Sequence, residues 1–175
     1  MKTYLELLNK IKYFSESKFK GVYSRPFTRH VIINSHDPKS KNFSVIYGDF
    51  NRLNDVNQKY SEKVGDILVA NTYSTVHKIL HQYFPNCEYS ISQIGGDEFL
   101  IIVDSCDETK LKDCFEHIHN IIDTEKSTPK FVDFAYGIVT SDEEKFDTIY
   151  EMINKAEHKQ AINKIFPNNN EYTFE

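Results

Sequence analysis

Two adjacent carboxylates, Asp97 and Glu98, stand between two short apolar segments of the chain. A pair of glycines, Gly95 and Gly96, directly precedes them. A Gly-Gly pair between strand-like segments predicts a tight β-hairpin, because glycine adopts positive φ angles without steric strain. Adjacent carboxylates are costly to bury without partners, so this pair is either solvated or held by a cation. The hairpin tip is therefore a candidate cation site.

A third carboxylate, Asp49, follows an apolar and β-branched segment, residues 43–47, that predicts a buried strand ending at Gly48 and Asp49. A strand that ends in a carboxylate and faces a hairpin tip with two more is a common arrangement for Mg²⁺. The ion keeps most of its water molecules and takes one or two carboxylates together with substrate phosphates. These residues therefore favour a metal-dependent site that binds phosphate groups.

The two segments together resemble the GGDEF family, the diguanylate cyclases. Residues 95–99 read Gly-Gly-Asp-Glu-Phe. Residues 48–66 are similar, without a gap, to the family stretch G-D-[IF]-N-x-[LF]-K-x-[IV]-N-D-x-Y-G-H-x-x-G-D. A GGDEF string alone is moderately specific, but its combination with this upstream segment is a strong signal. The upstream positions that match are Asp49, Asn57, Tyr60, Gly65 and Asp66.

The resemblance implies a metal site that holds two Mg²⁺ (or Mn²⁺) ions per active site. Asp49 and Glu98 would be metal ligands, and the Phe50 carbonyl would complete the protein's share. Asp97 would be a further ligand or would assist deprotonation of an attacking 3′-hydroxyl. Asp97 and Glu98 are therefore the expected catalytic residues.

The resemblance also implies the contacts to the phosphates and the sugar. Gly95 and Gly96 would let the α-phosphate and the ribose approach the backbone. The loop from Phe50 through Arg52 to Leu53 would offer amide N–H groups to the β- and γ-phosphates, as in a backbone nest at a helix start.

Asn57 and Asp66 would read the guanine base. A carboxylate accepts hydrogen bonds from both N1–H and the 2-amino group of guanine, which adenine cannot supply. Asp66 therefore favours GTP over ATP. Ordinary structural roles stay open beside this one: Asp49 and Asp66 could each be a helix N-cap, and Asn57 could be a helix-surface residue.

The chain departs from the family pattern where the triphosphate would bind. Asn54 stands at the position of a family lysine. Ala161 and Ile165 stand where the family's last helix carries its phosphate-binding lysine and arginine. A lysine acts as a flexible point charge and can take over such a role. The candidate replacements are Lys159, which we expect to bind the nucleotide, Lys164 and Arg52.

The favoured hypothesis is a diguanylate cyclase that condenses two GTP molecules into cyclic di-GMP and releases pyrophosphate. Each domain of this family holds one GTP, so the resemblance implies a transient antiparallel homodimer. The replaced cations leave an alternative, a degenerate GGDEF domain that binds GTP or another nucleotide as a regulatory module without turnover. A cyclase with a different cyclic product is a third possibility, which Asp66 disfavours.

Composition limits the classes of protein to consider. A chain of 175 residues with a formal net charge of −5 predicts one domain without the basic surface that nucleic acid binding requires. Its three cysteines lack C-x-x-C spacing, which is typical of a reducing compartment. The amino terminus has no apolar run long enough for a signal peptide or a membrane span. We therefore expect a cytoplasmic protein without a membrane partner.

Apolar periodicity predicts where the elements lie. The expected order, β-α-β-β-α-β with flanking helices, is that of a ferredoxin-like or palm-type α+β domain with a mainly antiparallel sheet and the GGDEF motif on a β-hairpin. Residues 1–19 would form an amino-terminal helix and residues 20–175 the GGDEF domain. Helices are expected over residues 3–16, 64–83 and 111–122 and from 146 to just before Pro167. Strands are expected over residues 30–34, 43–47, 88–94, 99–103, 131–139 and 171–174.

Overall fold

Four strands form one antiparallel sheet in the order β2-β3-β1-β4. The computed structural model describes residue 11 and residues 14–124 and 130–165. This sheet order is the one that a β-α-β-β-α-β chain adopts in ferredoxin-like folds, so the predicted α+β class is confirmed. The strands are β1 (Ser44–Phe50), β2 (Tyr89–Gln93), β3 (Glu98–Val103) and β4 (Phe134–Thr140).

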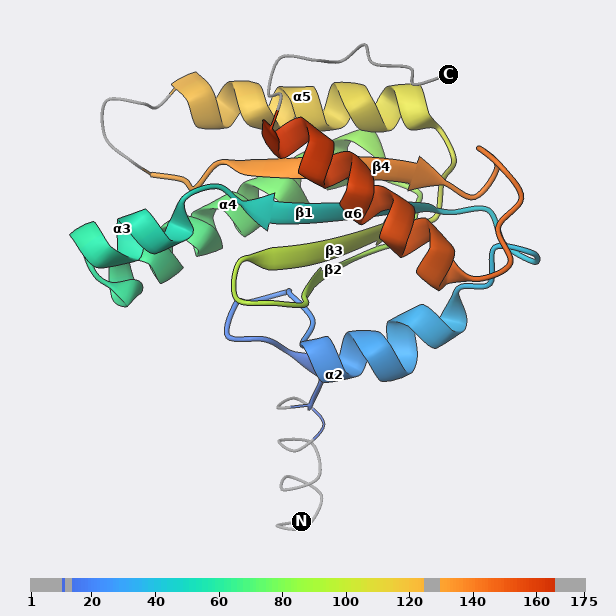
Figure 1. Ribbon diagram of the computed structural model, residues 1–175, viewed down its shortest axis with the longest axis horizontal. Helices are drawn as coiled ribbons and strands as arrows, with labels where there is room; N and C mark the ends of the chain where they lie inside the picture. The colour runs from blue at the N-terminus through green and yellow to red at the C-terminus, as the bar shows by residue number, and fades with distance from the viewer. Residues whose placement is uncertain (1–10, 12–13, 125–129, 166–175) are drawn as a thin grey trace.

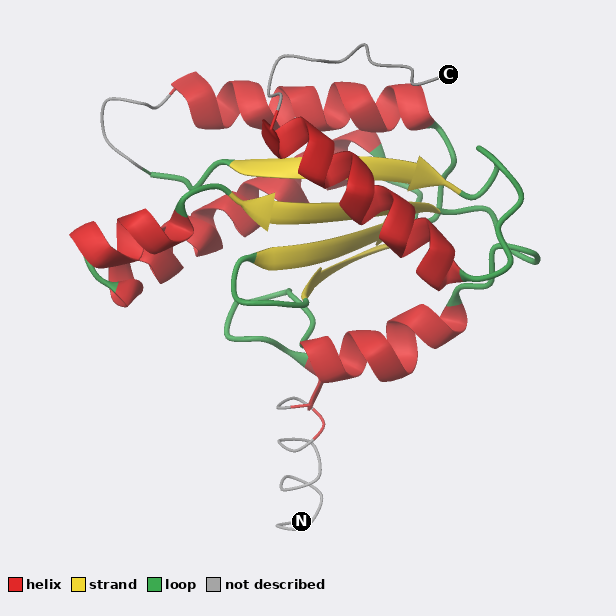
Figure 2. Ribbon diagram, in the orientation of Figure 1, coloured by secondary structure: helices red, strands yellow, loops and turns green. Residues whose placement is uncertain are grey.

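Helices cover both faces of the sheet (Figure 1, Figure 2). The long helix α4 (Glu62–Tyr83) and helix α5 (Glu108–Thr124) lie against one face, and α6 (Ile149–Ile165) crosses the other. A short helix, α3 (Leu53–Lys59), connects β1 to α4. On the other face, α6 packs against the central strands together with Ile33 of the turn η2 (Ile33–Ser35).

Strand β1 shows why its side chains divide between two cores. Ile46 and Phe50 pack with α4 and α5, whereas Val45 and Tyr47 pack with α6. Because side chains alternate with a period of two, Asp49 lies on the same face as Tyr47. The last carboxylate of β1 is therefore directed to the α6 side.

Most predicted elements are confirmed, with boundaries that shift by a few residues. The predicted helix over residues 3–16 lies mostly outside the described residues, and the predicted strand 171–174 lies wholly outside them. The predicted strand over residues 30–34 is wrong. That segment continues a helical stretch made of α2 (Arg25–Phe27), the π-helical turn η1 (Thr28–Ile32) and the 3₁₀ turn η2 (Ile33–Ser35).

The amino-terminal cap explains why residues 30–34 are helical. Ser24 Oγ accepts a hydrogen bond from Phe27 N at 3.3 Å, and Pro26 stands in the first turn, where proline favours a helix. The β-branched run that suggests a strand buries only one of its side chains fully: Ile33 is buried, whereas Val31 is 41% exposed. A capped start therefore outweighs a short run of β-forming residues.

Helix α6 packs closely against β4 at Gly137, which has no side chain to separate them. A Cβ atom added there would lie 2.1 Å from the Ala156 carbonyl oxygen and 2.6 Å from Gln160 N, so the helix backbone touches the strand directly. The amide of Asn163 adds a hydrogen bond to the Tyr136 carbonyl at 2.8 Å. These contacts fix the carboxyl-terminal end of α6 over the end of β1.

The turn between α3 and α4 contains a strained residue. Ser61 has φ +149° and ψ 161°, a backbone conformation that glycine adopts readily and that is strained for serine. It stands where the GGDEF pattern has glycine. Its hydroxyl accepts a weak capping hydrogen bond from Val64 N at 3.4 Å, which offsets little of the strain.

We predict that Ser61→Gly raises the free energy of unfolding by about 1 kcal/mol, because relief of backbone strain exceeds the lost cap and the added chain entropy. Urea unfolding followed by circular dichroism measures the change. Ser61→Ala is the control, since it removes the cap but keeps the strain and is expected to be slightly destabilising. A glycine variant less stable than the parent would show that Ser61 is not strained.

Candidate active site

The pairing of β1 with β3 brings the predicted carboxylates together. Asp49 lies directly opposite Glu98 in the antiparallel register, so both side chains are on the α6 face. The Phe50 amide donates to the Asp97 carbonyl oxygen at 2.8 Å, which ties the end of β1 to the hairpin tip. Residues far apart in the sequence thus form one acidic group where the two central strands of the sheet meet the hairpin tip.

The hairpin is confirmed, but the reason given for its glycines is wrong. Among the described glycines, only Gly21 has a positive φ angle, at 74°. Gly95 is needed for space instead, because a Cβ atom there would lie 2.3 Å from Glu98 Oε2. A Cβ atom on Gly96 would meet nothing within 4 Å. Gly95 therefore permits the position of the Glu98 carboxylate.

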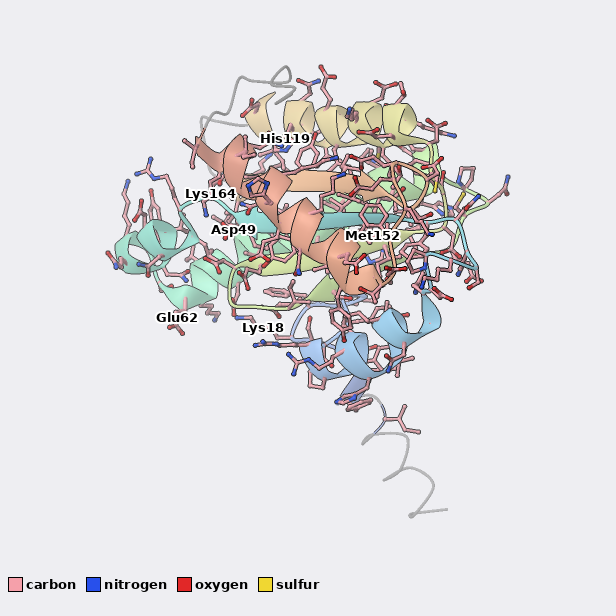
Figure 3. The ribbon with its side chains drawn as sticks, turned by 45° about the vertical axis from the view of Figure 1, so that its right-hand side comes forward. Lys18, Asp49, Glu62, His119, Met152 and Lys164 are labelled. Carbon is pink, nitrogen blue, oxygen red and sulfur yellow. The ribbon has the colours of Figure 1, made fainter. Side chains whose placement is uncertain are left out.

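The environment of Asp49 disfavours an unpaired negative charge. Its side chain is only 17% exposed. Burial raises the pKa of Asp49, and the nearby Asp97 and Glu98 raise it further, whereas an ion pair with Lys164 opposes the shift. Figure 3 shows Lys164, from the last turn of α6, beside Asp49.

Tyr47 stands two residues before Asp49 on the same face. Burial raises the pKa of the Tyr47 hydroxyl, and a hydrogen bond with Glu98 raises it further. The hydroxyl therefore stays protonated and can donate to the Glu98 carboxylate. Sequence reasoning missed this contact, because Tyr47 and Glu98 lie on different strands and only the register of β1 against β3 brings them to one face.

The carboxylates fit an oxygen-ligand cation that also uses substrate phosphates. Among the described residues, no three His, Cys, Asp or Glu side chains converge as a complete metal site. Asp97 is exposed at the tip, and only Asp49 and Glu98 face each other. Mg²⁺ needs no more than one or two protein carboxylates. The Lys164 ammonium provides the positive charge at Asp49 that a metal ion would otherwise provide.

The loop after β1 has fewer free donors than its sequence suggests. The amides of Phe50 and Asn51 are bonded to the carbonyls of Asp97 and Asp133, at 2.8 and 2.7 Å. Among the described residues, the amides of Arg52 and Leu53 have no such partner. Arg52 has a left-handed conformation with φ 56°, and its side chain, 83% exposed, pairs with Asp55 at 2.8 Å.

Asp133, the residue directly before β4, holds the same loop. Its carboxylate accepts from Asn51 Nδ2 at 3.0 Å and pairs with His119 Nδ1 at 3.0 Å. Burial alone would raise the pKa of Asp133, but the hydrogen bonds from His119 and Asn51 lower it below its ordinary value. This carboxylate therefore stays ionised and fixes the loop position.

The residues predicted to read guanine lie where α3 meets α4. Asn57 Oδ1 is buried without a hydrogen-bond partner and packs on Gly65, where a Cβ atom would approach it to 1.9 Å. Asp66 is the next residue, inside α4, and accepts from Lys18 Nζ at 2.5 Å. Neither Asp49 nor Asp66 is a helix cap, since Arg52 precedes α3 and Ser61 precedes α4.

A surface pocket of about 350 Å³ lies beside the hairpin tip. Lys18 and Arg25 line it from the amino-terminal segment, and Gln93, Gly95 and Gly96 line it from the hairpin. The pocket therefore joins the tip to the lysine that holds Asp66. Sequence reasoning missed Lys18, because nothing local links it to a residue 48 positions away.

Lys159, expected to bind the nucleotide, is directed elsewhere. Its ammonium donates to the Ile138 carbonyl at 2.9 Å and to both Glu143 carboxylate oxygens at 2.9 and 3.1 Å. Burial alone would raise the pKa of Glu143, but hydrogen bonds from Lys159 and Lys155 lower it below its ordinary value. The lysine of α6 at the acidic group is Lys164 instead.

The sheet order and the acidic hairpin define a palm-type α+β domain. The sequence profile described as "Diguanylate cyclase, GGDEF domain" matches residues 23–166. The chain belongs to the GGDEF domain family. No curated protein sequence matches it significantly.

Solved structures of GGDEF proteins share this fold. The GGDEF domain of DgcB from Caulobacter crescentus in complex with c-di-GMP is 12% identical, with 87% of this chain and 91% of that chain covered and a TM-score of 0.66. The GGDEF domain of PA1120 (TpbB or YfiN) from Pseudomonas aeruginosa is 15% identical over 86% and 89%, with a TM-score of 0.70. The S helix-GGDEF-EAL structure of LapD from Vibrio cholerae, bound to c-di-GMP, is 17% identical over 96% and 38%, with a TM-score of 0.71. At these identities the likeness establishes the fold. No helix within the described part of this chain is long and apolar enough to cross a membrane.

We predict that Asn57 and Gly65 are energetically coupled, so that the effects of substituting them on the free energy of unfolding do not add. Gly65→Ala should lower the free energy of unfolding by about 1–3 kcal/mol, because the new methyl group collides with the Asn57 amide. In the Asn57→Ala background the same change should cost clearly less, since the colliding atom is gone. Urea unfolding of the four proteins in this double-mutant cycle gives the coupling energy. An equal loss in both backgrounds would contradict the packing of Asn57 on Gly65.

Proposed function

We propose that this protein is a diguanylate cyclase that condenses two GTP molecules into cyclic di-GMP and releases pyrophosphate. The observation that carries the proposal is the register of Asp49 against Glu98, beside the hairpin tip that bears Asp97. Family membership over residues 23–166 supports the reaction class. The Asn57 side-chain oxygen, buried without a partner against Gly65, the residue before Asp66, supports a base-binding end of the same site.

Asp49, Glu98, Asp97 and the Phe50 carbonyl would hold two Mg²⁺ or Mn²⁺ ions. When bound, such ions neutralise charge that develops on the transferring phosphoryl group. The amides of Arg52 and Leu53 would donate to the terminal phosphates, and the glycines of the tip would let the ribose approach. The chain's own contribution is thus to fix the acidic ligands and to position the triphosphate.

Asp97 is the residue best placed to meet a second GTP, because its side chain is exposed at the tip. Its carboxylate would accept the proton of the attacking 3′-hydroxyl. The 3′-oxygen then bonds to the α-phosphorus while the bond from that phosphorus to the β-phosphate oxygen breaks, and pyrophosphate leaves. Two such transfers close the ring, so two domains must meet as a transient antiparallel homodimer.

A second candidate function rests on the cations. Ala161 and Ile165 replace the family's phosphate-binding lysine and arginine, and Lys164 is bound to Asp49 rather than directed to solvent. A domain of this kind that binds GTP or another nucleotide without turnover would serve as a regulatory module. The two candidates differ in product and not in fold, so turnover distinguishes them.

We predict that purified protein incubated with GTP and Mg²⁺ or Mn²⁺ at high protein concentration forms cyclic di-GMP, read by mass spectrometry. Asp97→Ala should lower the rate by about 10²–10⁴-fold, because a positioned proton acceptor is lost. Asp142→Ala, which removes an exposed carboxylate from the β4–α6 loop, is the control and should leave the rate unchanged. Unchanged turnover in Asp97→Ala would refute the role of Asp97. GTP binding without product would favour the regulatory module.

We predict that Asp66 sets the preference for guanine. In the parent protein, 3′-deoxy-GTP should bind about tenfold or more tightly than 3′-deoxy-ITP, which lacks the 2-amino group. Asp66→Asn should weaken 3′-deoxy-GTP by a similar factor and largely remove the difference. Isothermal titration calorimetry measures both ligands without turnover, since neither carries the attacking hydroxyl. A preference that survives Asp66→Asn would place the base elsewhere.

A further inference from the structure

Asp49 requires a positive charge before any ligand arrives. Its carboxylate is mostly buried, and Asp97 and Glu98 are like charges close to it. A carboxylate that is removed from water and faces other carboxylates is stable in its ionised form only with a cation beside it. That cation is Lys164, whose ammonium contacts Asp49 Oδ1.

The base of Lys164 is fixed, whereas its tip is able to move. The neighbouring Asn163 bonds to the Tyr136 carbonyl at 2.8 Å, and Gly137 lets α6 lie directly on β4. The Lys164 side chain is 45% exposed and carries its charge on a flexible four-carbon stem. It can therefore leave Asp49 without any movement of the helix.

The other lysines of α6 and the arginine after β1 are already paired. Lys155 and Lys159 are both held by Glu143, at 3.0 and 2.9 Å. Arg52 pairs with Asp55 and points into solvent. Of the lysines of α6, only Lys164 reaches the acidic group, one residue before the position at which the family has its arginine.

We propose that Lys164 is a two-position cation of this site, and the proposal rests on the proposed function. Without a divalent ion, Lys164 neutralises Asp49. When the metal and the nucleotide occupy the site, the metal takes Asp49 and Lys164 turns to the triphosphate, where it replaces the lysine and arginine lost at positions 161 and 165. The same side chain thus competes with the metal and assists the nucleotide.

This arrangement couples the two ligands. A divalent ion alone must displace the ammonium and leaves it without a partner, so its affinity is low. A triphosphate gives the displaced ammonium a new anionic partner, so each ligand raises the affinity of the other by the same factor. A lysine that only stabilised the fold would not produce effects of opposite sign on metal and nucleotide.

The test measures both ligands on the parent protein and on Lys164→Gln. Mn²⁺ affinity without nucleotide, from the electron paramagnetic resonance signal of free Mn²⁺, should rise about threefold, the scale of a partly exposed ion pair. Affinity for 3′-deoxy-GTP with Mg²⁺, from calorimetry, should fall about tenfold through the lost charged hydrogen bond. Lys155→Gln is the control, because it removes an equal charge from the same helix at Glu143 and should change neither affinity.

Opposite shifts in Lys164→Gln, with no shift in Lys155→Gln, establish the two-position role. Unchanged affinities, or a parallel loss of both, overturn it. The outcome is independent of turnover: opposite shifts without cyclic di-GMP would uphold Lys164 and refute the cyclase. Product formation with no opposite shifts would do the reverse.

Discussion

The antiparallel register of β1 against β3 is the constraint on which the rest of the site depends. It sets Asp49 opposite Glu98 and places both on the face that α6 covers. A slip by one residue would turn every β1 side chain to the other face and move Asp49 into the core between the sheet and α4. Most of β1 is apolar on both faces, so the contrast that opposes the slip lies at its end, where Phe50 is buried and Asp49 would have to take its side of the sheet. The adjacent Asp49 and Phe50 thereby determine on which face the acidic group stands.

Two carboxylates of the proposed site pair with lysines that are distant from them in the sequence. Lys18, in the amino-terminal segment, pairs with Asp66, and Lys164, at the end of α6, pairs with Asp49. Each lysine stands at a carboxylate that the proposed ligand would need, one at the base and one at the metal. In the proposed function, groups of the ligand would take the place of these ammonium groups.

Much of this arrangement could be predicted from the sequence, because it depends on local pattern. The helical period of residues 64–83 and the apolar arms of the hairpin gave elements that the structure confirms. The strand predicted over 30–34 failed, since the cap at Ser24 is a stronger signal than a β-branched run. Gly95 was assigned to the hairpin for its φ angle but is required by contact with Glu98. Lys164 and Asp49 lie 115 positions apart in the sequence. Which lysine pairs with Asp49 depends on how α6 packs on the sheet, and no local sequence pattern encodes that packing.

Crystallography would show whether Asp49 and Glu98 form the metal-binding end of a GTP site. The crystals would contain Mn²⁺ and a GTP analogue with a methylene bridge between the α- and β-phosphorus atoms. Such an analogue cannot release pyrophosphate, so the loaded site is trapped. We expect a manganese anomalous peak between the two carboxylates, guanine against Asp66, and the Lys164 ammonium on the triphosphate. A peak at any other location, or an occupied nucleotide with no manganese at Asp49, would contradict this expectation.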